Sequence, residues 1–348
     1  MKLDAALPPV PLAEVPAIAA AAESIGFDAL WTTETTHDPF LPHALIAEHT
    51  TKLHSGTAIA VSFARSPATI AYTAWDLAAQ SHGRFILGLG TQVRSHIERR
   101  FGLEWPDSVT GKLREQIQVI RAFWDCWQNG APLNFRGEYY KITLMAPFFN
   151  PGPLLPSPEG SGAGGEGRAG GIIPIYIAGV NTGLASLAGE LCDGFHVHPF
   201  HTPAYLREIM LPAIAAGAEK AGRPKADVTV SVTAFVASTP QEREAARQQI
   251  AFYASTPSYR PVLAQHGWTE AGAMLSSLAA HGRWAEMPAL VTDEMLETFG
   301  VLTDESDLAA AIHKRYNGIA DRITLYMPFV PGERDGFWKV LASTLRNY

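Results

Sequence analysis

Strand-like and helix-like segments alternate eight times along the 348-residue chain, and this alternation limits the fold more than any single motif does. The strand-like runs are short and mostly apolar, as expected of parallel strands that are buried on both faces. They are predicted at 3–7, 29–33, 56–61, 85–89, 173–178, 194–198, 228–236 and 322–327. Helical patterns follow them at 12–24, 42–52, 67–81, 108–128, 181–191, 203–221, 241–254 and 336–345. Eight βα repeats predict an α/β fold, a closed (β/α)8 TIM barrel rather than an open doubly wound sheet, because closure leaves no strand edge exposed.

Two long segments interrupt the regular spacing, after the fourth and the seventh predicted strands. Residues 131–171 contain the stretch PGPLLPSPEGSGAGGEGRAGG, whose composition is typical of a mobile surface excursion, and this segment can act as a lid. Deletion of residues 156–169 would test the lid. Residues 255–319 are richer in helix formers and aromatic side chains, so we expect extra helices there. Neither segment resembles a separate domain, and we predict one domain over residues 1–348.

Charge and composition exclude several classes of partner. The net charge of −7 shows no basic excess, which argues against nucleic acid and anionic membranes and favours a small-molecule ligand. Cys126 and Cys192 have no metal-type spacing, and we expect both to be reduced. The apolar run Val15–Ala22 is too short to span a membrane. We therefore predict a cytoplasmic globular protein.

The segment Gly83–Arg100, GRFILGLGTQVRSHIERR, ends an apolar run in a Gly-Leu-Gly turn and continues at once with polar and cationic side chains. Glycines let the main chain approach a ligand closely, and nearby cations offset the charge of a phosphate. The segment is a candidate site for a phosphorylated cofactor, although an ordinary strand-to-loop turn explains Gly-Leu-Gly equally well. Arg94 or His96 can face the phosphate, or Arg94 can simply pair with Glu98 on one helix face.

In a barrel of this kind the active site lies where strands end and βα loops begin. The second predicted strand is followed by Glu34, His37 and Asp38, which can supply acid–base or cofactor-orienting groups. A solvated loop with a helix N-cap explains Asp38, but Glu34 comes close behind an apolar strand, so we favour a function for it. After the fifth strand, Asn181 or Thr182 is a candidate N-cap whose helix start either holds a phosphate or is only capped.

The sixth predicted strand ends in His196 and His198, which share one face at positions i and i+2. This spacing is compatible with the metal site of a TIM-barrel hydrolase, but no carboxylate follows nearby to complete a ligand set. Histidines at a barrel mouth serve equally well in hydrogen bonding or proton transfer. We therefore expect no metal ion and keep a metal-dependent hydrolase as a minor alternative that metal analysis would test.

Five segments in order resemble the bacterial luciferase-like superfamily: AESIGFDALWTTE, GTAIAVSFARSP, SHGRFILGLGT, IPIYIAG and LCDGF. Two later segments, IAFYASTPSYRPVLAQHGW and LTDESDLAAAIHKRYNGIADRITLYMPF, are most similar to its branch that uses the deazaflavin coenzyme F420. The resemblance covers nearly the whole chain. It implies a TIM-like barrel with insertions and a deazaflavin bound in the mouth. It also implies hydride transfer between C5 of the coenzyme and a small apolar ketone, alkene or alcohol.

The resemblance also implies roles for individual residues. Glu34 would lie beside the coenzyme ring, and Ala58-Ile59 would match a non-prolyl cis peptide that forms a bulge behind the ring. Five residues would lie near the coenzyme's side chain and phosphate, namely Gly90, Thr91, His96, Gly179 and Val180. On the substrate side, four aromatic residues are candidates, although core packing would explain any one of them: Phe63, Phe148, Phe149 and Trp268.

One departure from the family affects proton transfer. Dehydrogenases of this superfamily have a histidine directly after the acidic residue that matches Glu34, whereas this chain has Thr35 there and His37 as the nearest histidine. We therefore expect His37 or His198 to transfer the proton, unless an alkene or ketone substrate takes it from water.

Two alternative functions share this fold. An FMN-dependent monooxygenase would differ in its bound cofactor and would consume oxygen, and a non-enzymatic member would bind a flavin or deazaflavin without turnover. Dimers are common in the resembled family, so we expect a homodimer, but no exposed apolar stripe identifies an interface.

Overall fold

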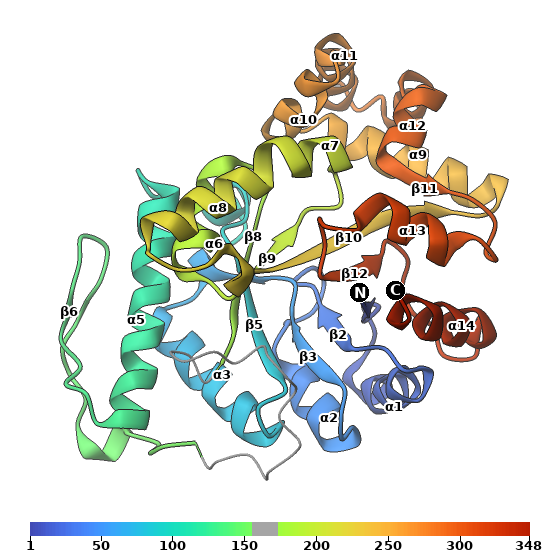
Figure 1. The fold of residues 1–348 in the computed structure, drawn as a ribbon. Coiled ribbons are helices and arrows are strands. Elements are labelled where there is room, and N and C mark those ends of the chain that lie inside the picture. Colours follow the sequence, from blue (N-terminus) through green and yellow to red (C-terminus); the bar gives the residue numbers. More distant parts are fainter. Residues whose placement is uncertain (155–172) are drawn as a thin grey trace.

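The structure is a computed structural model that describes residues 1–154 and 173–348, and its centre is a closed barrel of parallel strands (Figure 1). Each barrel strand has two neighbours, and β12 pairs with β1 to complete the circle. In order around the barrel, the strands are β1 (Lys2–Ala6), β2 (Ala29–Thr32), β3 (His54–Thr57), β5 (Phe85–Gly90), β8 (Ile175–Gly179), β9 (Gly194–Val197), β10 (Thr229–Ala237) and β12 (Arg322–Leu325). The predicted (β/α)8 barrel and its eight strands are confirmed, with strand ends that differ by a few residues.

Helices cover the outside of the barrel (Figure 1). They are α1 (Val15–Ile25), α2 (Leu41–His49), α3 (Pro67–Gln80), α5 (Val109–Asn129), α6 (Thr182–Leu191), α8 (Leu211–Lys220), α13 (Leu308–Tyr316) and α14 (Asp335–Arg346). Side-chain caps fix where several of them begin: the Ser66 hydroxyl accepts from Thr69 N–H in α3, and Ser108 accepts from Gly111 N–H in α5. The helix predicted at 203–221 is divided into α7 (Pro203–Tyr205), a π-helical turn over Leu206–Met210, and α8.

A buried ion pair joins the first and last strands inside the barrel. The Arg322 guanidinium donates to both carboxylate oxygens of Asp4 at 2.8 Å, and the Trp31 indole N–H donates to the same carboxylate at 2.9 Å. Both charged side chains are fully buried. A buried pair is costly to break by removing one partner, so these contacts hold the barrel closed below its mouth.

The first insertion begins with a short antiparallel hairpin of β6 (Phe135–Arg136) and β7 (Lys141–Ile142) beside α5 (Figure 1). Its turn is held by the Glu115 carboxylate of α5, which accepts the backbone N–H groups of Glu138, Tyr139 and Tyr140 at 2.7 to 3.1 Å. This hairpin precedes the Gly/Pro-rich stretch whose composition predicted a mobile excursion, and the two predictions do not conflict. The predicted lid residues 156–169 lie outside the described residues.

The second insertion forms helices, as predicted, and gathers with α9 (Pro240–Ala254) on one side of the barrel (Figure 1). Its elements are α10 (Arg260–Gln265), α11 (Thr269–Ala280), the 3-10 helix η7 (Trp284–Leu290), α12 (Asp293–Phe299) and the short strand β11 (Gly300–Leu302), which extends the sheet next to β10. α9 lies over the carboxyl ends of the strands, because its Tyr253 contacts His198 beyond β9 and Tyr326 beyond β12. α9 therefore belongs spatially to the inserted helices that border the mouth.

Candidate active site at the barrel mouth

A bulge follows β3 at the rim of the barrel. The peptide bond between Ala58 and Ile59 is cis, at the position that the family resemblance implies. The chain then resumes as β4 (Ala60–Val61), which pairs with the last residues of β5. Ala58 and Ile59 are half-buried although the strand behind them is buried, so the bulge presents an apolar surface at the mouth.

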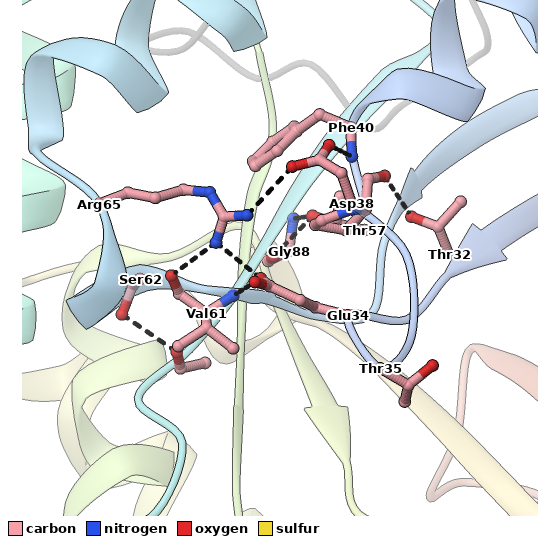
Figure 2. A network of polar contacts seen from close by, with 12 residues as sticks. Thr32, Glu34, Thr35, Asp38, Phe40, Thr57, Val61, Ser62, Arg65 and Gly88 are labelled. Carbon is pink, nitrogen blue, oxygen red and sulfur yellow. Dashed lines mark hydrogen bonds and ion pairs between the residues drawn. The ribbon is translucent and has the colours of Figure 1, made fainter. Parts of the chain in front are cut away.

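Glu34 holds this bulge at two points, and Figure 2 shows the one made by its carboxylate. Its backbone N–H donates to the Ile59 carbonyl at 3.2 Å, and its carboxylate Oε2 accepts from Val61 N–H at 2.7 Å. The same oxygen accepts from the Arg65 guanidinium at 2.6 Å, and only 6% of the Glu34 side chain is exposed. A carboxylate bonded in this way fixes backbone, so the geometry makes Glu34 a positioning group for the bulge.

Arg65 is a part of this network that the sequence analysis missed (Figure 2). It bridges Glu34 to Asp38, whose Oδ2 lies 3.2 Å from its second terminal nitrogen, and it also donates to the Val61 carbonyl at 3.1 Å. The segment GTAIAVSFARSP contains Arg65, but no pattern within that segment links it to a carboxylate far away in the chain. The charge of Arg65 compensates the largely buried charge of Glu34.

The other polar residues after β2 are more exposed. Asp38 lies just before α2, and its Oδ1 accepts from the N–H groups of Phe40 and Leu41 at 2.8 and 3.2 Å. Because Phe40 is the N-cap position of α2, Asp38 stabilises the turn before the helix and is not its N-cap. His37 is exposed, and within the described residues its side chain takes part in no hydrogen bond or ion pair. The candidate proton donor His37 is thus not held toward Glu34 by any partner.

Packing accounts for the glycines of the Gly-Leu-Gly turn. A Cβ atom on Gly88 would lie 1.7 Å from the Thr57 carbonyl oxygen, and one on Gly90 would lie 2.6 Å from the Ile59 side chain. Thr57 also exchanges two hydrogen bonds with the Gly88 backbone, at 2.6 and 2.9 Å. Glycine at these positions lets β5 pack closely against β3 and the bulge. This reason differs from the one considered from the sequence, which is the close approach of a phosphate to the main chain.

Beyond β5, Thr91 is buried and the short helix α4 (Arg94–Arg99) is mostly exposed. Arg94 pairs with Glu98 at 2.8 Å, which is the simpler of the two predicted arrangements. His96 lies exposed on the same helix. The structure therefore leaves His96 free to meet a ligand but does not direct it inward.

After β8, the N-terminus of α6 faces the rim. Asn181 is the N-cap, as predicted, and its side chain accepts from Leu184 N–H at 3.0 Å. Gly179 and Val180 are half-buried just before it, and the Val180 carbonyl accepts from the Tyr205 hydroxyl at 3.1 Å. The first N–H groups of a helix have no intrahelical acceptor, so this rim segment suits an anionic group.

The two histidines of the sixth predicted strand have separate surroundings. His196 lies inside the barrel against Trp31 and Tyr176, with ring centroids 4.9 and 5.1 Å apart, and burial lowers its pKa to about 3. His198 lies above it, stacked on Tyr259 at 4.5 Å. Among the described residues, no three His, Cys, Asp or Glu side chains are arranged to hold a metal ion, so the hydrolase alternative has no ligand set there.

A cluster of phenols surrounds His198, and the sequence analysis missed it. Tyr253 meets His198 edge-on at 4.7 Å, the Tyr259 hydroxyl lies 3.0 Å from His198 Nε2, and the Tyr326 hydroxyl lies 2.7 Å from that of Tyr253. Burial raises the pKa of Tyr259 to about 12 and lowers that of His198 to about 3, so both groups are neutral near pH 7. We call these four residues the phenol cluster.

The aromatic residues expected on the substrate side do not gather. Phe63 packs against Trp105 at 5.9 Å, and Trp268 stacks on His266 at 4.8 Å. Phe148 and Phe149 lie beyond the hairpin β6–β7, and Phe148 is 91% exposed. Core packing therefore explains Phe63, and within the described residues no ring contact joins Phe63 or Trp268 to the pair Phe148 and Phe149.

Two hollows lie away from these residues. One of about 1010 Å³ is bordered by α9, η7 and α12, and one of about 430 Å³ is bordered by β11 and α13. None of the predicted site residues lines either hollow. We place the site at the rim because the bonded, partly buried polar groups converge there. No helix in residues 1–154 or 173–348 is long and apolar enough to cross a bilayer.

Fold and rim together define a class of protein: (β/α)8 barrels that bind a small ligand at the carboxyl ends of their strands. The chain belongs to the luciferase-like monooxygenase family, whose model matches residues 3–322. This match confirms the resemblance stated from the sequence and identifies the chain as an enzyme of that family.

Several relatives match over most of the chain. The uncharacterized protein Rv1360 of Mycobacterium tuberculosis is 41% identical over 330 residues, which are 93% of this chain and 92% of that protein. A 5,10-methylenetetrahydromethanopterin reductase of Methanolobus tindarius is 28% identical and covers 94% of both chains. An F420-dependent glucose-6-phosphate dehydrogenase of Nakamurella multipartita is 29% identical over 70% of this chain and 68% of its own.

Solved structures share the fold. The coenzyme F420 dependent tetrahydromethanopterin reductase from Methanopyrus kandleri has a TM-score of 0.79 at 19% identity and covers 99% of this chain and 98% of its own. An F420-dependent secondary alcohol dehydrogenase in complex with an F420-acetone adduct has a TM-score of 0.70 at 18% identity and covers 99% of both chains. The barrel with its insertions is thus the fold of this family.

Proposed function

We propose that the chain is an F420-dependent oxidoreductase that transfers a hydride between the deazaflavin and a small apolar organic substrate at the barrel mouth. The observation that carries this proposal is the bulge after β3. Ala58 and Ile59 present a half-buried apolar surface, and Glu34 fixes the backbone behind them through Ile59 and Val61. A flat ring can rest on such a surface without displacing a side chain.

The rest of the rim fits the anionic part of such a coenzyme. α6 begins beside Gly179 and Val180, and its free N–H groups would stabilise a phosphate. Thr91 and His96 follow Gly90 on the neighbouring strand and loop and would hold the chain that joins ring and phosphate. When bound, F420 supplies the hydride chemistry, and the protein orients it and the substrate.

The relatives favour F420 over FMN. The Nakamurella multipartita dehydrogenase, which matches 70% of this chain, is named for its F420 dependence. The family description, luciferase-like monooxygenase, keeps FMN and oxygen chemistry as the second candidate. We further propose that the protein acts in the cytoplasm, where a chain of net charge −7 would meet a small-molecule substrate.

The proposal is tested by titrating the purified protein with F420 and, separately, with FMN, and following the quenching of coenzyme fluorescence. We expect saturable binding of F420 and at least tenfold weaker binding of FMN. Tighter binding of FMN, with oxygen consumption in the presence of a reductant, would move the function to monooxygenase chemistry. Binding of neither coenzyme would overturn the proposal.

A further inference from the structure

The phenol cluster lies on the part of the mouth opposite the bulge. Its residues follow β9 and β12 or come from α9 and the segment after it: His198, Tyr253, Tyr259 and Tyr326. All four side chains are half-buried, so they border the mouth instead of filling the core. Within residues 1–154 and 173–348, no hydrogen bond, ion pair or ring contact joins Glu34 or Arg65 to the phenol cluster, so the cluster needs a role of its own.

The bonds of His198 fix its tautomer. Its Nδ1 accepts from the backbone N–H of Phe200 at 3.1 Å, so Nδ1 carries no proton. The ring is neutral, because burial lowers its pKa to about 3, and its single proton is therefore on Nε2. It follows that Nε2–H donates to the Tyr259 hydroxyl oxygen, 3.0 Å away.

This assignment leaves one phenolic proton in the cluster unused. Tyr326 donates to the Gln249 side-chain oxygen at 3.2 Å, so Tyr253 donates to Tyr326 at 2.7 Å. The Tyr259 oxygen receives a bond from His198, and within the described residues its own proton has no acceptor. Tyr259 is thus a positioned hydrogen-bond donor with a free O–H at the barrel mouth.

We propose that Tyr259 donates its proton to the carbonyl oxygen of a ketone substrate, and that His198 positions Tyr259 for this step. The proposal rests on the proposed function and names its substrate class. The carbonyl carbon receives a hydride, with its electron pair, from the reduced coenzyme, which is oxidised. The C=O π electrons move to oxygen, and a new O–H bond forms as the Tyr259 O–H bond breaks. The ketone becomes an alcohol, and the phenolate, stabilised by His198 Nε2–H, regains a proton from water.

The geometry also explains why Thr35 replaces the family's histidine without loss of a proton donor. The loop after β2 supplies no fixed donor, since His37 is exposed and Glu34 is engaged by Val61 and Arg65. Tyr259 supplies one from the second insertion instead. A phenol also matches a neutral carbonyl better than a charged imidazole would in a partly dry site.

The test uses acetophenone as the probe and Tyr259→Phe as the variant. Infrared difference spectra of bound acetophenone are recorded with oxidised F420 and without coenzyme, so that no turnover occurs. A hydrogen bond from Tyr259 shifts the carbonyl stretch to lower frequency in the wild type, and Tyr259→Phe abolishes the shift. Reduction of acetophenone by reduced F420 is expected to be about 100-fold slower in the variant, within the usual range for a general acid. F420 affinity should change less than twofold.

Controls separate a proton donor from a structural residue. Tyr72→Phe removes a phenol on α3 whose hydroxyl donates to the Phe149 carbonyl, away from the phenol cluster. This variant should keep the shifted carbonyl band and the wild-type rate of acetophenone reduction. His198→Gln keeps an N–H donor for Tyr259 and should retain most of the band shift, whereas His198→Leu should lose it. If His198 only filled space, His198→Gln and His198→Leu would have the same effect on the band.

An unshifted band in the wild type, or identical bands in the wild type and Tyr259→Phe, would overturn the proposal even if F420 binds. Absence of F420 binding in the wild type would instead overturn the proposed function. In that case, the infrared spectra recorded without coenzyme still show whether Tyr259 donates a hydrogen bond to the carbonyl of acetophenone.

Discussion

The two sides of the barrel mouth use polar side chains in opposite ways. On the side of β2, β3 and β5, Glu34, Arg65 and Thr57 bond to backbone or to one another, and they fix the shape of the bulge. On the side of β9 and β12, the phenol cluster keeps a donor, the Tyr259 hydroxyl, whose proton has no acceptor in the part of the chain that the structure describes. The difference teaches that completed bonds fix the shape of the bulge side, whereas on the other side the Tyr259 hydroxyl is available to a ligand.

The bulge side should tolerate changes in its packing least. Gly88→Ala would force a Cβ to within 1.7 Å of the Thr57 carbonyl oxygen, which is backbone and cannot rotate away. We expect a loss of more than about 3 kcal/mol in the free energy of unfolding, measured by urea denaturation. Gly336→Ala in α14 is the matched control, because no atom lies within 4 Å of its added Cβ. Equal stability of the two variants would show that β5 does not pack against β3 as described.

The ion pair on the bulge side comes next. Arg65→Met leaves the Glu34 carboxylate largely buried without its cation, and we expect about 2 kcal/mol of destabilisation by the same measurement. Arg65→Lys keeps the charge and should cost less than half of that. If Arg65→Met had the same free energy of unfolding as the wild type, the hydrogen bond from Val61 N–H alone would be enough to stabilise the buried Glu34 carboxylate.

The phenol cluster should contribute to the pH dependence of stability through His198. Burial lowers the pKa of His198 to about 3, so between pH 6.5 and 3 the unfolded chain binds a proton that the folded protein does not. Stability from this residue is therefore complete above pH 6.5 and is lost as pH falls. We expect it to contribute about 1.4 kcal/mol to the loss between pH 7.5 and 5.5.

His198→Gln should remove that contribution from the pH dependence of urea denaturation. A profile for His198→Gln that is as steep as that of the wild type would contradict the buried, neutral state of His198.

The smallest effect is expected within the phenol cluster. Tyr253→Phe removes one hydrogen bond, to the Tyr326 hydroxyl, and should lower stability by about 1 kcal/mol. Because Tyr253 lies across the mouth from the bulge, F420 affinity measured by fluorescence should not change. A marked loss of affinity would place the coenzyme against the phenol cluster.

Periodicity predicted the barrel because each strand and helix carries its own apolar pattern, which requires no knowledge of distant residues. The local N-cap at Asn181 could be predicted for the same reason. Arg65 and the phenol cluster could not, because their partners lie far apart in the chain and meet only after the barrel closes. The glycines of β5 show a third case: their positions were noticed, but their packing against Thr57 and Ile59 depends on strand neighbours that sequence does not reveal.

The central claim is that the bulge side binds the coenzyme and the phenol cluster serves the substrate. The most direct test is a parallel F420 titration of the wild type, Glu34→Ala and Tyr259→Phe by fluorescence quenching. The account predicts about tenfold or greater weakening of F420 binding for Glu34→Ala, about 1.4 kcal/mol, and wild-type affinity for Tyr259→Phe. Weaker binding by Tyr259→Phe, with Glu34→Ala unaffected, would contradict it.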